Sequence, residues 1–145
     1  MKKILVVCTG NSCRSQMAEG YLRKYSKNNL DLYSAGISPD KINQNTIDTM
    51  FLDGIDISNH TSNNVLEYLD YKFDFVITLC NNAKLNCPSF AYNPKIIHRN
   101  FLDPYNSQGN DIQIKSVYMN VREEIKLFCQ EFISSNFKDL YINEF

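Results

Sequence analysis

Hydrophobic residues follow two alternating patterns along the chain, short apolar runs and longer segments in which they recur at helical spacing. The short runs are rich in β-branched and aromatic residues, which is typical of buried strands. They cover residues 3–7, 30–34, 73–79 and 95–98. Helical spacing predicts helices from Ser15 onward, around residues 47–51 before Gly54, over residues 64–69, and in a long final segment over residues 114–133.

This order of elements predicts the fold class. Strands that alternate with helices form right-handed crossovers and a parallel sheet that is covered on both faces. We therefore expect an α/β protein with a flavodoxin-like, doubly wound sheet of about four parallel strands. Its 145 residues match one ordinary domain, so residues 1–145 are expected to form a single domain. Ligands of such sheets bind beyond the carboxyl ends of the strands, where Cys8, Cys80 and Asp103 are expected to emerge.

Charge and hydropathy exclude several classes of protein. With 15 basic and 16 acidic residues the formal net charge is −1, so we expect no nucleic acid partner. No apolar stretch approaches the roughly 20 residues of a membrane span, so no membrane partner is expected either. The apolar run from Ile4 to Val7 is too short for a signal peptide. We expect a cytoplasmic protein and a monomer.

The cysteines point to chemistry of their own. In the cytoplasm structural disulfides are rare, and cysteines tend to be catalytic, redox-active or metal-bound. The chain has no Cys-x-x-Cys spacing, and its two histidines stand alone, so we expect no structural metal site. The five cysteines are Cys8, Cys13, Cys80, Cys87 and Cys129. Of these, Cys129 falls on the apolar side of the last helix and is expected in the core, while Cys13 is expected only to pack.

The segment from Cys8 to Ser15 reads CTGNSCRS and joins the first strand to the first helix. A loop of this length can turn successive backbone N–H groups inward, where the positive end of the helix dipole adds to them. Arg14 can place two hydrogen bonds on a tetrahedral oxyanion, Gly10 is expected to supply unusual backbone angles, and Ser15 either caps the helix or hydrogen-bonds the Cys8 sulfur. The predicted oxyanion site comprises Thr9, Gly10, Asn11, Ser12, Cys13, Arg14 and Ser15.

The same loop predicts that Cys8 is a nucleophile. A helix N-terminus and a nearby arginine lower a cysteine pKa from about 8.5 to roughly 3.5–7.5, so the donors that bind the oxyanion also favour the thiolate. The alternative is that Cys8 is a small buried hydrophobic residue at the end of a strand. That alternative leaves Gly10, Arg14 and Ser15 unexplained.

Several segments together resemble a known family. They read CTGNSCRSQMAEG, YSAGI, DISNHTS, VITLC and LDP, and they span most of residues 3–104. The chain resembles the low-molecular-weight tyrosine phosphatase superfamily, and within it the thioredoxin-coupled arsenate reductases. The resemblance implies that the loop binds arsenate, that phosphate or sulfate can also occupy it, and that thioredoxin donates the electrons, with no tightly bound cofactor.

The resemblance also implies a relay of three cysteines. Cys8 would attack arsenate, Cys80 would attack the Cys8 sulfur as arsenite leaves, and Cys87 would attack Cys80. The resulting Cys80–Cys87 disulfide would be reduced by thioredoxin. The alternative is that Cys80 and Cys87 are two unrelated thiols, although Cys87 lies in a polar run before Pro88, which is a poor place for a core residue.

The spacing of this pair has a structural consequence. If residues 80–87 were helical, about 1.5 Å per residue would place the two Cα atoms roughly 10 Å apart, beyond the limit of about 7 Å for a disulfide. The segment would have to unwind on oxidation. We hypothesise that Asn81, Asn82 and Asn86, which are poor helix formers, make this change easy and expose the disulfide to thioredoxin.

Asp103 matches the general acid of the superfamily and would protonate the departing oxygen of the oxyanion. The alternative is a turn-forming aspartate, because Asp-Pro often begins a turn. Here Asp103 is followed by Pro104 and Tyr105, a run more typical of the phosphatases. A tyrosine phosphatase that uses Cys8, Arg14 and Asp103 therefore remains an alternative, as does a non-catalytic module that binds phosphate or a phosphoprotein.

The resemblance further implies a candidate potassium site. Asn11, Glu19 and Ser34 match positions that help to bind potassium in some reductases of this group. Asn63 stands where those proteins have the remaining carboxylate, so this chain lacks one charge of the site. His60 is expected to orient the segment around it rather than to bind a metal.

Overall fold

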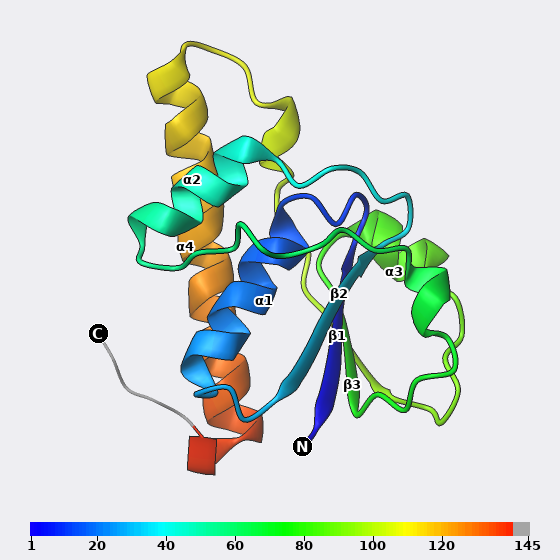
Figure 1. Ribbon diagram of the computed structural model, residues 1–145. Coiled ribbons are helices and arrows are strands. Elements are labelled where there is room, and N and C mark those ends of the chain that lie inside the picture. Colours follow the sequence, from blue (N-terminus) through cyan, green and yellow to red (C-terminus); the bar gives the residue numbers. More distant parts are fainter. Residues whose placement is uncertain (141–145) are drawn as a thin grey trace.

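The predicted α/β class and doubly wound parallel sheet are confirmed by a computed structural model, which describes residues 1–140. The four strands are parallel and lie in the order β2-β1-β3-β4 (Figure 1). They are β1 (Lys3–Cys8), β2 (Asp31–Gly36), β3 (Phe75–Thr78) and β4 (Lys95–His98). The helices are α1 (Arg14–Tyr25), α2 (Gln44–Leu52), α3 (Asn81–Asn86) and α4 (Asp111–Asn136), with short 3-10 helices η1 (Val65–Tyr68), η2 (Pro104–Asn106) and η3 (Lys138–Leu140).

The core forms around β1, whose central residues from Ile4 to Val7 are buried. Because β1 is covered on both faces, its sequence is a continuous apolar run rather than an alternating one. Helices α1 and α4 pack together on one side of the sheet, and α3 lies on the other side (Figure 1). Within residues 1–140, no helix has the length and apolar character needed to cross a membrane.

Two predicted elements differ in detail from the structure. The strand expected over residues 73–79 is shorter and covers only Phe75–Thr78. Phe73 lies outside the strand, and its ring packs against the rings of Tyr33 and Tyr71. The helix expected over residues 64–69 is the 3-10 helix η1, which begins at an Asn64–Glu67 capping box.

A third difference concerns α3, since the segment between Cys80 and Pro88 is a short helix. Three of its residues are asparagines, which have a low helix propensity, so propensity alone does not predict this helix. The helix is held by backbone hydrogen bonds from the Lys84 N–H to the Cys80 carbonyl at 3.0 Å and from the Cys87 N–H to the Ala83 carbonyl at 2.9 Å. Cys80 and Cys87 therefore flank the helix at its two ends.

The sheet order places two loops at one edge. The chain leaves β1 toward β2 on one side, whereas β3 and β4 lie on the other side. Such a reversal of strand order opens a crevice at the carboxyl ends of the two central strands. Val7 pairs with Thr78 in the β1–β3 register, so the loop that starts after Cys8 and the turn at Cys80 lie next to each other.

Candidate active site

The loop between β1 and α1 forms one wall of a hollow of about 160 Å³ at this edge of the sheet. Of the predicted oxyanion-binding residues, Asn11 and Ser15 do not line the hollow and lie buried behind it. Asp103 does line it, as the resemblance implied. The lining residues are Cys8, Thr9, Gly10, Ser12, Cys13, Arg14, Ser38, Asp40, Asp103 and Tyr105.

Arg14 is held in place from behind. Its Nη1 donates a hydrogen bond to the Phe101 carbonyl at 3.0 Å, and its Nη2 lies 3.4 Å from the Asp103 Oδ2. Because Arg14 is 7% exposed, few other orientations of the guanidinium are open to it. The guanidinium is thus presented to the hollow in a fixed direction, as bidentate binding of an oxyanion needs.

The unusual backbone angle of the loop belongs to Asn11, not to Gly10 as predicted. Asn11 has φ 50°, in the left-handed region, whereas Gly10 has no positive φ. Asparagine tolerates this region better than most residues, and here its own side chain is tied down by the Asn63 N–H, which donates to Asn11 Oδ1 at 2.8 Å. The Gln16 side chain also donates to the Asn11 carbonyl at 2.9 Å.

Ser15 hydrogen-bonds the nucleophile rather than capping the helix. Its Oγ lies 2.9 Å from the Cys8 Sγ, and α1 has no side-chain cap at its N-terminus. The Asn11 Nδ2 donates to the same Ser15 Oγ at 2.7 Å. Because Ser15 accepts from Asn11, its own hydroxyl hydrogen is free to point at the Cys8 sulfur, an arrangement that favours the thiolate.

Burial changes the expected acidity of Cys8. The prediction of a lowered pKa is wrong for this structure, because burial raises the pKa of the Cys8 thiol above its ordinary value. The hydrogen bond from Ser15 and the charge of Arg14 both act in the opposite direction and limit the rise. The loop thus lowers the pKa of Cys8, as predicted, but the burial of the thiol, which the sequence does not reveal, raises it by more.

Asp103 forms a turn, and it also lies where the acid of the alternative interpretation was expected. Its Oδ1 accepts a hydrogen bond from the Tyr105 N–H at 3.0 Å and so starts η2, which is a turn-forming role. Its Oδ2 forms an ion pair with Arg14 at 3.4 Å, and the side chain lines the hollow, where a general acid would have to lie. Tyr105 lies on the rim and is 59% exposed.

Cys80 is buried against the oxyanion loop. Its Sγ lies 3.3 Å from the Thr9 Oγ1, and it accepts a hydrogen bond from the Ala83 N–H at 3.4 Å at the start of α3. The Asn82 Nδ2 donates to the same Thr9 hydroxyl at 3.0 Å. Thr9 therefore connects the loop of Cys8 with the helix that carries Cys80.

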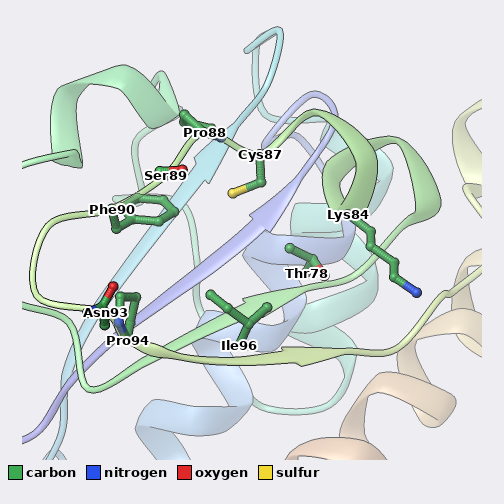
Figure 2. Close-up of a pocket in the computed structure, with 9 residues that line it drawn as sticks. All are labelled: Thr78, Lys84, Cys87, Pro88, Ser89, Phe90, Asn93, Pro94 and Ile96. Atoms are coloured by element: carbon green, nitrogen blue, oxygen red, sulfur yellow. The ribbon is translucent and has the colours of Figure 1, made fainter.

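Cys87 lies at the other end of α3, in a separate hollow of about 330 Å³. Figure 2 shows its sulfur directed toward the side of this hollow that Phe90 forms. The residue is half-buried, and burial raises the pKa of its thiol to about 11. The structure does not bring Cys87 together with the rest of the predicted site.

The two other cysteines are buried. Burial raises the pKa of Cys13 to about 12 and raises that of Cys129 as well. Cys129 lies in the core, as predicted. Of the histidines, His98 shares hydrogen bonds with Thr78 and Asn81, and burial lowers the pKa of His60.

Comparisons with known proteins decide the family. Residues 3–140 match the model of the low molecular weight phosphotyrosine protein phosphatase family. The chain belongs to this family. An arsenate reductase of Halalkalibacterium halodurans is 44% identical over 124 residues, which are 86% of this chain and 89% of that protein. An arsenate reductase of Staphylococcus aureus strain Newman is 41% identical over 133 residues, which are 92% of this chain and 97% of that protein.

Two solved structures are similar to this chain. A structure described as an arsenate reductase in the phosphate binding state has a TM-score of 0.74 and 30% identity, with 93% of this chain and 98% of that chain covered. The Vibrio vulnificus protein Wzb in complex with benzylphosphonate has a TM-score of 0.78 at 22% identity, with 92% of this chain and 98% of that chain covered. The second likeness concerns the fold alone.

The candidate potassium site of this family member is already filled with hydrogen-bond donors. Glu19 Oε1 accepts from the Ser34 hydroxyl at 2.7 Å, and Glu19 Oε2 accepts from the Arg23 Nη1 at 3.0 Å. Asn11 Oδ1 is taken by the Asn63 N–H. Within the described part of the chain, no group of three or more His, Cys, Asp or Glu side chains could hold a metal ion. The residues present do not fit a bound potassium ion.

Sequence reasoning missed two groups of residues at the phosphatase-family site. Ser38 and Asp40 reach the hollow because the chain after β2 runs beside the loop, with the Asp40 N–H donating to the Gly10 carbonyl at 2.8 Å. The predicted parallel sheet held a signal for these two, because parallel strands end at the same edge and β2 lies next to β1. Gln16 and Arg23 act from behind the loop, and no local pattern in the sequence marks them.

Proposed function

We propose that this protein reduces arsenate to arsenite with Cys8, Cys80 and Cys87, and that thioredoxin reduces the disulfide that results. The family and the relatives named arsenate reductase support arsenate reduction or phosphatase-type chemistry. The observation that favours reduction is the place of Cys80, which is buried and contacts Thr9 of the oxyanion loop at 3.3 Å. The alternative phosphatase chemistry uses Cys8, Arg14 and Asp103 and gives Cys80 no step.

In the first step arsenate occupies the hollow and is held by the loop and by Arg14. The Cys8 sulfur attacks arsenic, a sulfur–arsenic bond forms, and one oxygen of arsenate leaves as water. The departing oxygen needs a proton. Asp103, which lines the same hollow, is the group placed to supply it.

In the second step the Cys80 thiolate attacks the Cys8 sulfur. A Cys8–Cys80 disulfide forms, the sulfur–arsenic bond breaks, and its electron pair passes to arsenic, which leaves as arsenite. In the third step Cys87 attacks Cys80, and Cys8 is released as a thiolate. Overall, arsenate and two thiols become arsenite, one disulfide and water.

The third step requires a change of structure, because Cys80 and Cys87 flank α3. Unwinding of α3 also moves Cys87 out of the hollow where burial keeps its thiol protonated. One change therefore both brings the sulfurs together and frees the attacking thiolate. We further propose that the protein acts in the cytoplasm as a monomer without a tightly bound cofactor, since thioredoxin supplies the electrons.

A single-turnover experiment tests the relay. Reduced protein is mixed with arsenate without thioredoxin, and arsenite and disulfides are then measured by mass spectrometry. We expect one arsenite per protein and a Cys80–Cys87 disulfide in the wild type, and a Cys8–Cys80 disulfide in Cys87→Ser. Arsenite release from Cys80→Ser equal to that of the wild type would refute the relay, and Cys129→Ser serves as a matched control.

A phosphatase remains the second candidate, because Cys8, Arg14 and Asp103, the three residues that phosphatase chemistry would use, line the same hollow. It would use Cys8 as nucleophile and Asp103 as acid. Hydrolysis of an aryl phosphate distinguishes the two functions. A phosphatase would lose this activity in Asp103→Asn and keep it in Cys80→Ser, with no turnover of arsenate in either.

A further inference from the structure

A buried carboxylate lies behind the oxyanion loop, and its counter-charge comes from the chain itself. We propose that the Arg23 guanidinium is the internal cation of Glu19, in place of a bound potassium ion, and that it positions Cys8 through a chain of hydrogen bonds. This inference rests on the proposed role of Cys8 as nucleophile. Arg23 would act as a positioning residue, because it does not line the hollow that receives the oxyanion.

The environment of Glu19 calls for a cation. The Glu19 side chain is 11% exposed, and a buried carboxylate is stable only when it is paired and hydrogen-bonded. Arg23, one turn further along α1, supplies both through its 3.0 Å contact with Oε2. Ser34 donates to the other carboxylate oxygen at 2.7 Å. Both oxygens of the carboxylate are thus occupied by donors from the chain.

The Asn63 side chain also disfavours a metal ion here. Its Nδ2 lies 3.4 Å from the Ser34 carbonyl and 3.2 Å from the Thr61 carbonyl. Because carbonyl oxygens only accept, the amide nitrogen must face them. Asn63 therefore presents an N–H donor, and not a charged oxygen, to the Ser34 carbonyl beside Glu19.

A first set of hydrogen bonds connects Arg23 to the loop. The Arg23 Nη1 lies 3.2 Å from the His60 Nε2, and since arginine only donates, that nitrogen accepts. The same nitrogen lies 3.4 Å from the Glu19 Oε2, and burial lowers the pKa of His60, which favours the neutral ring and leaves Arg23 as the cation of Glu19. The His60 Nδ1 then carries the hydrogen and donates to the Gln16 Oε1 at 3.0 Å. The Gln16 Nε2 donates to the Asn11 carbonyl at 2.9 Å. Each group in this series donates toward the loop.

A second set continues from the loop to the nucleophile. Asn11, the residue with the left-handed backbone, donates to Ser15, and Ser15 in turn contacts Cys8. The two sets meet at Asn11, where the first ends on the backbone carbonyl and the second starts from the side-chain amide. Arg23 therefore acts on Cys8 by position: it helps to hold Asn11 in the conformation that places its amide on Ser15, and Ser15 contacts the Cys8 sulfur.

The test compares Arg23→Met with Arg23→Lys and with Lys24→Met, which removes a charge from the next position of α1. The first readout is the pH profile of Cys8 alkylation by iodoacetamide, followed by mass spectrometry. We expect the profile of Arg23→Met to move to higher pH, with alkylation at neutral pH slower on the order of threefold. Arg23→Lys should recover part of the rate, and Lys24→Met should match the wild type.

The second readout is the melting temperature in potassium chloride and in sodium chloride at equal ionic strength. The wild type should melt at the same temperature in both salts, because Arg23 already neutralises Glu19. Arg23→Met should melt lower by about 2–4 °C for each kcal/mol lost, and potassium should restore part of this loss where sodium does not.

Two outcomes would overturn the proposal. One is a potassium-specific rise in the melting temperature of the wild type, which needs no variant to fold. The other is an alkylation profile of Arg23→Met that coincides with that of Lys24→Met. Neither readout uses arsenate or thioredoxin, so a failure of the proposed reductase activity would leave this test intact, and the reverse also holds.

Discussion

Helix α3 separates the two cysteines that the proposed relay must join. With about 1.5 Å per residue, the Cα atoms of Cys80 and Cys87 lie roughly 10 Å apart across the helix, whereas a disulfide allows about 7 Å at most. Formation of the Cys80–Cys87 disulfide must therefore unwind α3 and break the hydrogen bond from the Cys87 N–H to the Ala83 carbonyl. A substitution that weakens α3 without touching either sulfur should favour the oxidised form.

Leu85 is the position at which to weaken the helix. Its side chain is 80% exposed, so its replacement removes little packing. Leu85→Gly should lower the stability of the helix by about 0.8 kcal/mol, which corresponds to a factor of about four in an equilibrium constant. Since the helix stabilises only the reduced form, the reduction potential of the Cys80–Cys87 pair should become more negative by about 18 mV.

Equilibration in a series of glutathione buffers measures this potential. The protein carries Cys8→Ser so that only the pair of interest reacts, and the two redox forms are separated by alkylation and mass spectrometry. Leu85→Ala is the matched control, because alanine keeps the helix propensity while it removes the same side chain. Equal potentials for Leu85→Gly and the parent protein, or equal shifts for glycine and alanine, would refute the reasoning.

Four further predictions concern the loop and the Cys87 thiol. Gly36→Ala would place a Cβ 2.6 Å from the Thr9 carbonyl oxygen, so the loop must shift, and phosphate affinity measured by calorimetry should fall on the order of a hundredfold. Arg14→Lys keeps the charge but loses the forked geometry, and we expect phosphate to bind about tenfold more weakly or worse by the same method. Cys87 has its pKa raised from 9.0 to about 11 in the folded protein, so its alkylation at pH 9 should be about fiftyfold slower than in urea. The unfolded Cys87 thiol loses its proton first as pH rises, so the free energy of unfolding, measured with urea, should fall between about pH 9 and about pH 11.

Each of these has a control in the same chain. Arg99→Lys removes a guanidinium that lies over the Phe128 ring and not in the hollow, so it should leave phosphate binding unchanged. Retained phosphate affinity in a folded Gly36→Ala protein would contradict the close approach of the loop. A Cys87→Ser variant should lose part of the decrease in stability at high pH, and an unchanged decrease would assign it to other groups.

The elements of the fold that were predicted correctly are those that local sequence patterns specify. The β-branched run of β1, the short loop after it and the apolar period of α1 lie next to one another in the sequence, and each specifies its element by short-range physics. The long period of α4 does the same. The parallel direction of the strands followed from the rules for connections between alternating strands and helices, whereas their order came from the structure.

The features that the sequence did not reveal depend on contacts between distant segments. Helix α3 begins with a hydrogen bond to the Cys80 sulfur, which propensities do not contain. The acidity of Cys8 depends on burial by the whole fold, which outweighs the loop that was expected to lower its pKa. Arg23 and Glu19 lie one helical turn apart, so the sequence could suggest their ion pair. The contact between Arg23 and His60 joins residues 37 positions apart and forms only in the folded chain.

The most direct test of the proposed function is arsenate-dependent oxidation of NADPH in the presence of thioredoxin and thioredoxin reductase. We predict turnover by the wild type and by Cys129→Ser, and none by Cys8→Ser, Cys80→Ser or Cys87→Ser. A wild type that is inactive in a fully reduced preparation, yet hydrolyses an aryl phosphate with or without Cys80, would contradict the reductase and establish a phosphatase.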